Sequence, residues 1–242
     1  MKKSAGYTKI SRRAFWLLAF FLPVFLFAAC ARPGPDTNIA LDEDDCAACQ
    51  RIFPQGGWQF VHEIVFRFAK GEGRFLGIVA FDEEELRCAL TTLEGLTVFV
   101  ARAPLQAGKG EVQVERALPP LDKSAFAVGL VADLRLLFIA PAGAPRCGWR
   151  HGTRLCRWEN PGVIQEISVS QDGCWSIQVF KDGRLFRTAR ATGCAERDGY
   201  LIPGSISLYA TGGAEYELTM RLVSGNATPV KREGDGCRAR HR

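Results

Sequence analysis

Histidine is scarce in this chain, with only three in 242 residues, at positions 62, 151 and 241. The chain also has no Gly-x-Ser-x-Gly, no P-loop, no Gly-x-Gly-x-x-Gly and no His-Glu-x-x-His. His62 alternates with Phe60 and Ile64, which is typical of a buried, hydrogen-bonded histidine rather than a catalytic base. The acidic run at 82–85 is typical of a solvated strand end. We therefore expect no catalytic residue, no cofactor and no enzyme activity.

An excess of charge is missing as well, once residues 1–29 are set aside. The whole chain has 31 basic and 26 acidic residues, and residues 1–29 contain five of the basic ones and none of the acidic ones. The remainder therefore has 26 of each and no net charge. Nucleic-acid binding needs clustered Lys and Arg to neutralise phosphates. We expect no nucleic-acid partner.

The first 29 residues have the pattern of a secretory signal peptide. A basic stretch, "MKKSAGYTKISRR", precedes the uncharged run "AFWLLAFFLPVFLFAA" at 14–29. That run has 16 residues and contains Pro23, whereas a membrane-spanning helix needs about 20 apolar residues. A removable signal is therefore expected rather than a permanent span. "SRRAFW" at 11–16 also resembles the twin-arginine motif, so the export route, Sec or Tat, stays open.

Cys30 follows this apolar run directly. Ala28-Ala29-Cys30 resembles the bacterial lipobox, which implies that Cys30 is acylated, for example by palmitate, and anchors the chain to a membrane. By the same resemblance, Ala31 in place of Asp implies the outer membrane, facing the periplasm. The alternative is an ordinary signal followed by a cysteine by chance. Residues 30–50 are acidic and contain prolines, and we interpret them as a tether.

Eight cysteines remain when Cys30 is set aside, an even number that suggests disulfides in an exported chain. Cys147 and Cys156 flank a short loop, and Cys174 and Cys194 flank a predicted hairpin, so we expect these two pairs. Zinc at Cys147, His151 and Cys156 is the alternative, but no fourth ligand is evident and no metal is expected. "CAAC" at 46–49 lacks the histidine of a haem site and the βαβ context of a redox pair.

From Trp58 onward the pattern has period two, as in "FVHEIVFRF" at 60–68, with glycine-containing turns between the segments. Apolar residues at spacings of three and four predict one helix after Asp122, ending before Pro141. "DEEELRCAL" at 82–90 fits a second helix or a strand. We predict a mainly β domain over 51–230, a curled antiparallel sheet or half-open barrel of about 9–11 strands covered by one or more helices. Residues 231–242 are a basic C-terminal tail.

Two stretches carry a resemblance to a known family. "GVIQEISVSQDGCWSIQVFKDGRLFRTARA" at 162–191 and "YLIPGSISLYATGGAEYELTMRLV" at 200–223 resemble the terminal hairpins of the LolA/LolB-like lipoprotein carrier superfamily, with Pro203 opening the penultimate strand. "FVHEIVFRFAKGEGRFLGIVAF" at 60–81 and "LEGLTVFVARA" at 93–103 are similar to its first meander. The resemblance covers about 55–225. It departs in its many cysteines and in lacking an identifiable protruding apolar loop.

The resemblance implies a half-open barrel with a helical lid and a cavity that receives acyl chains. The expected function is lipoprotein or (glyco)lipid localisation to the outer membrane, with lipid or lipoprotein acyl chains and a periplasmic carrier protein as partners. The cavity candidates are inward-facing residues of two strands: Phe60, Ile64, Phe66, Phe68, Trp175, Ile177 and Val179. The alternative is a disulfide-stapled envelope lipoprotein whose core is closed and which acts as a structural or protein-interaction module.

Overall fold

A computed structural model describes residues 35, 46–69, 71–150, 152–211 and 215–228. The chain divides into two compact units, Met1–Gly34 and Pro35–Arg242, and every described residue belongs to the second. Cys30 and the basic tail lie outside the described residues. None of the helices within the described part has the length and hydropathy that crossing a membrane requires.

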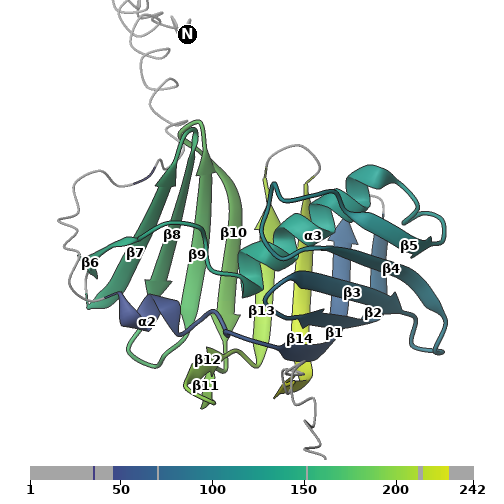
Figure 1. Cartoon of the computed structure of the whole chain (residues 1–242), viewed down its shortest axis with the longest axis horizontal. Helices are drawn as coiled ribbons and strands as arrows, with labels where there is room; N and C mark the ends of the chain where they lie inside the picture. The colour runs from purple at the N-terminus through teal and green to yellow at the C-terminus, as the bar shows by residue number, and fades with distance from the viewer. Residues whose placement is uncertain (1–34, 36–45, 70, 151, 212–214, 229–242) are drawn as a thin grey trace, which may run out of the picture. The chain divides into compact units, whose positions relative to one another are not determined.

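The second unit is built on one antiparallel sheet, which Figure 1 shows curving around a helix. Its 12 strands follow the order β5-β4-β3-β2-β1-β14-β13-β10-β9-β8-β7-β6. The strands are β1 (Trp58–Phe68), β2 (Gly71–Phe81), β3 (Glu85–Thr91), β4 (Thr97–Pro104), β5 (Gln113–Ala117), β6 (Arg146–Arg150), β7 (Thr153–Asn160), β8 (Val163–Val169), β9 (Trp175–Lys181), β10 (Arg184–Thr192), β13 (Ser205–Ala210) and β14 (Tyr216–Ala227). A separate two-stranded hairpin pairs β11 (Ala195–Arg197) with β12 (Tyr200–Ile202).

The chain makes two meanders that meet in the middle of the sheet. The first runs from β1 outward to β5, and the second runs from β6 inward to β14, which pairs with β1. Neighbouring strands connect through tight turns, and at Asp182-Gly183 both residues have positive φ, of 50° and 73°. An Asp-Gly pair tolerates such angles, which the right-handed strand twist favours in a two-residue turn. The predicted curled antiparallel sheet is therefore confirmed.

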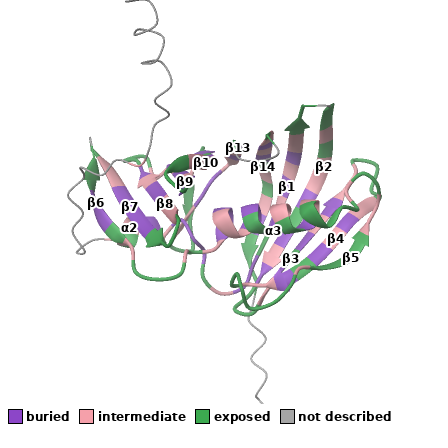
Figure 2. Ribbon diagram, turned by 90° about the horizontal axis from the view of Figure 1, so that it is seen from above, coloured by how far each residue is buried: buried purple, intermediate pink, exposed green. Residues whose placement is uncertain are grey.

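Two helices accompany the sheet. Helix α3 (Ser124–Phe138) crosses the part of the sheet that contains β14, β1 and the strands after it (Figures 1 and 2). Helix α2 (Ala47–Gln50) is a single turn at the other end of the sheet, near β7 and β8. The predicted helix begins two residues after Asp122, because Lys123 takes the N-cap position with extended backbone angles.

The sheet is wider than the predicted 9–11 strands. The additional strands include β6 and β7, which hold Cys147 and Cys156 and which the sequence suggested as a disulfide-closed loop. The ambiguous stretch at 82–90 is strand β3, whose burial alternates with period two, so no helix forms there.

Candidate functional site: the inner face of the sheet

One face of the main sheet is apolar across most of its width, and we call it the inner face. A continuous row of paired residues crosses seven strands on this face, from β7 to β1. Its members are Cys156, Ile167, Ile177, Ala189, Leu208, Leu218 and Phe66. All but Phe66 are at most 2% exposed. Side chains alternate between the two faces of a strand, so the row marks the side that faces the helices.

Helix α3 covers the part of the inner face that contains β1, β2 and β4. Its buried residues include Ala127, Val131, Leu134 and Phe138, at spacings that place them on one side of the helix. The Phe138 ring lies 5.2 Å from that of Phe60 and 6.3 Å from that of Phe81. The other end of the helix is held by Phe126, which meets Phe99 edge to face at 5.3 Å and contacts Phe66 at 6.3 Å.

One carboxylate lies in this apolar contact. Asp133 of α3 is 4% exposed, and its oxygens accept hydrogen bonds from Arg187 Nε of β10, at 3.1 Å, and from the Tyr216 hydroxyl of β14. Burial raises the pKa of the Asp133 carboxyl, and the two hydrogen bonds and the Arg187 charge oppose that rise. Burial and the neighbouring carboxylate likewise raise the pKa of Tyr216. We call Asp133, Arg187 and Tyr216 the latch, because they join the helix to two strands.

A second segment covers the inner face near β7, β8 and β9. We call residues 46–54 the strap; it contains α2, and its Cys49, Ile52 and Phe53 are at most 2% exposed. Disulfides join Cys46 to Cys147 of β6 and Cys49 to Cys156 of β7. The strap is therefore attached covalently to the edge of the sheet, whereas the contacts of α3 with other described residues are packing, hydrogen bonds and the Asp133–Arg187 ion pair.

Little space remains between these covers and the sheet. A void of about 10 Å³ lies between the strap, the end of α3 and the inner face. It is lined by Ile52, Pro54, Phe60, His62, Leu137, Phe138, Trp175, Ile202 and Pro203. That volume is at the lower limit for a single water molecule, so no acyl chain fits unless a cover moves.

Two polar atoms on this void have no hydrogen-bond partner among the described residues, His62 Nδ1 and Trp175 Nε1. His62 is 2% exposed, and burial lowers its pKa to about 4. The histidine is buried as its alternation predicted, but the hydrogen bond expected of it is not formed at Nδ1. It is neutral at pH 7, because a charge would be unsolvated there.

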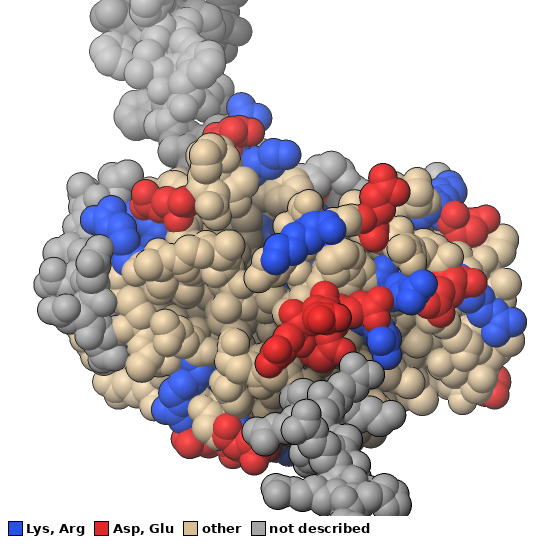
Figure 3. All heavy atoms as spheres, in the orientation of Figure 1, with Lys and Arg blue, Asp and Glu red and all other residues tan. Residues whose placement is uncertain are grey.

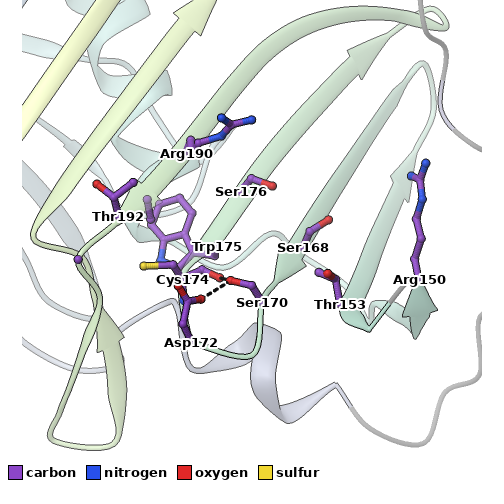
Figure 4. A pocket seen from close by; sticks show the side chains of 12 residues that line it. Arg150, Thr153, Ser168, Ser170, Asp172, Cys174, Trp175, Ser176, Arg190 and Thr192 are labelled. Atoms are coloured by element: carbon purple, nitrogen blue, oxygen red, sulfur yellow. Dashed lines mark hydrogen bonds between the residues drawn. The ribbon is translucent and has the colours of Figure 1, made fainter.

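A hollow larger than this void lies on the opposite side of the sheet (Figure 4). Its volume is about 540 Å³, and Ser168, Ser176 and Arg190 point into it from β8, β9 and β10. Asp172 at its rim accepts hydrogen bonds from Ser170 and from the Cys174 backbone. Hydroxyl and guanidinium groups line this hollow together with Trp175 and Ala191, so its lining is part polar and part apolar.

The seven predicted cavity residues lie on two strands of the inner face, but not in one cavity. Phe60, Ile64, Phe66 and Phe68 are on β1, and Trp175, Ile177 and Val179 are on β9, with β14, β13 and β10 between them. Phe60 and Trp175 both line the small void. Ile64 and Ile177 are buried, Phe66 and Val179 are half-buried, and Phe68 at the strand end is 44% exposed.

The cysteines pair in part as the sequence suggested. Cys174 is joined to Cys194 across the β9–β10 hairpin. Cys147 and Cys156 are direct cross-strand partners, but they bond to Cys46 and Cys49 rather than to each other. The expected Cys147–Cys156 bond is therefore wrong. Sequence separations of 101 and 107 hide the true partners, although the three-residue spacing of Cys46 and Cys49 on a helical turn was a signal that both face one side.

A few apolar side chains are exposed on the described surface, and two of them share one turn. Leu93 and Leu96, in the turn between β3 and β4, are 58% and 53% exposed. On the side of the molecule shown in Figure 3, acidic and basic side chains lie beside one another. The β3–β4 turn thus exposes two leucines, one on each side of Glu94 and Gly95.

Comparison with known proteins gives structural similarities alone. No protein-family model matches the chain. No curated protein matches it either. Among solved structures, a LolA superfamily protein from Nitrosomonas europaea is 10% identical with a TM-score of 0.46, over 76% of this chain and 91% of that one.

A domain described as an outer membrane lipoprotein-sorting protein, from Vibrio parahaemolyticus, is 10% identical with a TM-score of 0.48, over 77% of this chain and 91% of that one. A DUF1329 family protein from Desulfovibrio piger is 5% identical with a TM-score of 0.37, over 77% of this chain and 93% of that one. The superfamily that the sequence resembles is therefore among the similar structures. At these TM-scores, the similarities give no information about a ligand.

Proposed function

We propose that the inner face binds acyl chains when α3 is displaced, and that the chain is an envelope lipoprotein anchored through Cys30. In this proposal it takes part in the localisation of lipoproteins or (glyco)lipids to the outer membrane. The observation that carries the proposal is the attachment of α3. The helix covers an apolar surface continuous across the sheet, and no disulfide joins it to that surface among the described residues.

An acyl chain would replace the side chains that α3 places on the inner face. Phe126, Leu134 and Phe138 occupy positions against the sheet that a hydrocarbon chain could take over. Each methylene group transferred from water to such a surface contributes about 0.8 kcal/mol. A chain of ordinary length thus supplies enough free energy to compensate for the lost helix contacts, and no catalytic residue is needed.

The β3–β4 turn gives this proposal a route to the membrane. Leu93 and Leu96 project from the end of the sheet half that α3 covers. Two exposed leucines on one tight turn can enter the headgroup region of a bilayer, where their apolar surface leaves water. Contact there would bring the edge of the inner face close to the lipids.

The second candidate function is a closed, disulfide-stapled module that binds a protein partner or has a scaffolding role. The packing density of the inner face favours it. The void is about 10 Å³, and a Cβ placed on Gly77 would lie 2.2 Å from Ile64 Cδ1. In this case the aromatic residues are a core, and the inner face never meets a ligand.

Native mass spectrometry separates the two candidates. Residues 31–242, exported behind a cleavable signal and purified without detergent, should retain a lipid or acylated peptide that is released on denaturation. An empty domain that also fails to bind a fluorescent acyl probe would refute acyl binding and leave the closed module.

Variants on the helix sharpen this test. Asp133→Asn weakens the latch and should increase the rate at which an acyl probe enters by about tenfold, because the helix opens more often. Val128→Ala is the matched control, since Val128 is 57% exposed on the outer side of the same helix. Equal rates in the two variants would mean that displacement of α3 does not limit binding.

A further inference from the structure

The four cysteines that attach the strap form one cluster, although they are bonded in two separate pairs. The sulfurs of Cys46, Cys147 and Cys156 all lie within 4.8 Å of one another, and Cys49 is bonded to Cys156. Cys147 and Cys156 face each other directly across β6 and β7. Directly opposed residues of an antiparallel pair have Cα atoms about 4.5 or 5.5 Å apart, within the range that a disulfide spans. A second pairing, Cys147 with Cys156, is therefore within reach.

Access to the two bonds from solvent is unequal. Cys46 is half-buried, whereas its partner Cys147 is 1% exposed. Both sulfurs of the second bond belong to residues that are fully buried, Cys49 and Cys156, each 0% exposed. Cys46 is the most exposed of the four residues, so an external thiolate approaches the cluster at Cys46 rather than at the second bond. A disulfide exchanges only when a thiolate reaches one of its sulfurs.

We propose that this cluster is a thiol–disulfide exchange site that takes an external dithiol and releases the strap. One thiolate of the dithiol attacks Cys46 Sγ, the Cys46–Cys147 bond breaks, and Cys147 leaves as a thiolate. The second thiol of the reagent then closes on the first, and Cys46 leaves as a thiol. The external dithiol is thereby oxidised to its disulfide, and one disulfide of the protein is reduced.

The Cys147 thiolate is formed beside the bond that solvent cannot reach. It attacks Cys156 Sγ within 4.8 Å, the Cys147–Cys156 bond forms, and the Cys49–Cys156 bond breaks, so that Cys49 leaves as a thiolate. The sum of the two steps is the consumption of one dithiol. The products are one disulfide within the sheet and two thiols on the strap.

A single reduction at the surface thus removes both covalent attachments of the strap. Ile52 and Phe53, which are at most 2% exposed, would then be held on the inner face by noncovalent contacts alone, which include their own packing and the hydrogen bonds of Arg51 with Gly199 and Leu201. The importance of this release for ligand binding rests on the proposed function, but the exchange itself does not. Mapping the disulfides tests the exchange whether or not the inner face binds a lipid.

The experiment treats the full chain with one equivalent of dithiothreitol, alkylates it with N-ethylmaleimide, and maps the disulfides by mass spectrometry. Among the six cysteines that are disulfide-bonded in the described part of the chain, we expect Cys46 and Cys49 to be alkylated first, together with a new Cys147–Cys156 bond. Alkylation of Cys46 and Cys147 with Cys49–Cys156 intact would overturn the proposal. Loss of both bonds without a Cys147–Cys156 product would overturn it as well.

A variant makes the same exchange visible without a reductant. Cys46→Ser leaves Cys147 as a thiol, and we expect the Cys147–Cys156 bond and alkylated Cys49 in this variant. A map with Cys49–Cys156 intact in every molecule would contradict the proposal. Cys174→Ser is the control, because it leaves a thiol at Cys194, outside the cluster. There both strap disulfides should persist, and a Cys147–Cys156 product in the control would mean general scrambling and refute a site-specific exchange.

Discussion

The two covers of the inner face are attached in opposite ways. The strap is short, and two disulfides hold it at the β6–β7 edge. Helix α3 is 15 residues long and is held by apolar packing and by the latch. Disulfides across loops of this size stabilise a fold mainly by constraining the unfolded chain, and they resist local opening. A packed helix that no disulfide attaches opens more readily, because its noncovalent contacts can be exchanged for contacts with an apolar ligand.

The difference assigns distinct roles to the two halves of the sheet. The half that contains β6 to β9 is closed while both strap disulfides are intact, and Phe53 of the strap, Trp175 and Ile177 are buried there. The half that contains β1 to β4 is the end that opens in our proposal, and there α3 lies over Phe60, Phe66 and Phe99. A carrier that holds an acyl chain needs such an opening end, and a closed module does not.

The largest effect is expected from removing both strap disulfides, because either one alone still closes a loop of about a hundred residues. The variant with Ser at all four positions, Cys46, Cys49, Cys147 and Cys156, should lower the free energy of unfolding by at least about 4 kcal/mol, since loops with sequence separations of 101 and 107 are then open. The matched control Cys174→Ser/Cys194→Ser opens a loop with a separation of 20 and should cost about 1.5 kcal/mol less. Urea unfolding measures both. Equal losses would show that the strap does not constrain the unfolded chain.

The next effect concerns the latch. Asp133→Ala leaves Arg187, whose side chain is 13% exposed, without its partner carboxylate. This variant should lower the free energy of unfolding, measured by urea unfolding, by about 3 kcal/mol. The double variant Asp133→Ala/Arg187→Ala should cost at least about 1 kcal/mol less than the sum of the single variants, since each single variant leaves one charge of the pair unpaired and the double variant leaves none. Strict additivity would mean that the ion pair contributes nothing to holding α3.

A pH-dependent effect of somewhat smaller size is expected at His62. Its pKa is lowered from 6.5 to about 4 by burial, so between these values the unfolded chain binds more protons than the folded one. Stability is complete above pH 6.5 and should fall by up to about 3 kcal/mol as the pH decreases to 4. Asp133 changes stability in the opposite direction. Its pKa is raised in the folded state, so above pH 3.8 the folded chain binds more protons than the unfolded one, and this contribution to stability increases as the pH falls.

The variant His62→Gln isolates this contribution. Urea midpoints measured between pH 4 and 7 should be flatter for the variant than for the parent chain. A parent and a variant with the same slope would show that another group accounts for the loss of stability in acid.

The sequence was sufficient for the sheet but not for its covers. Period-two segments such as β1 and the Asp-Gly turn at 182–183 report local backbone preferences, so the antiparallel sheet could be predicted from them. The strap could not, because Cys46 and Cys49 find their partners about a hundred residues away. The inward side of each strand could be predicted from alternation. Whether a helix covers the inward side of the strands depends on tertiary packing, and tertiary packing produces no periodic pattern in the sequence.

The latch was missed for a related reason. Asp133 lies among apolar helix residues, and in the sequence it reads as a solvated charge that argues against a membrane span. Arg187 and Tyr216 lie on separate strands, 54 and 83 residues away. A buried carboxylate requires a hydrogen-bond or charge partner. The acidic residue within the apolar side of the helix therefore indicated that a partner exists, but it did not identify Arg187 and Tyr216.

The smallest expected effect is the most direct test of which half opens. Cys88 on the inner face of β3 is 4% exposed, and burial raises its pKa to about 12, so at pH 8 roughly one molecule in ten thousand is a thiolate. Alkylation of Cys88, followed on its own peptide by mass spectrometry, should therefore be very slow in the native protein. It becomes faster whenever α3 leaves the sheet.

Comparing two variants turns this rate into evidence about the covers. The free energy of unfolding of Asp133→Ala, measured in urea, gives the Cys88 alkylation rate expected from global unfolding alone. In this variant the measured rate should be at least tenfold higher, because α3 opens without global unfolding. In Cys49→Ser/Cys156→Ser, the rate should follow global stability alone, since the strap lies at the other end of the sheet. If both variants follow global stability, the two covers open together, the distinction between a fixed and an opening end fails, and the closed module accounts better for the fold.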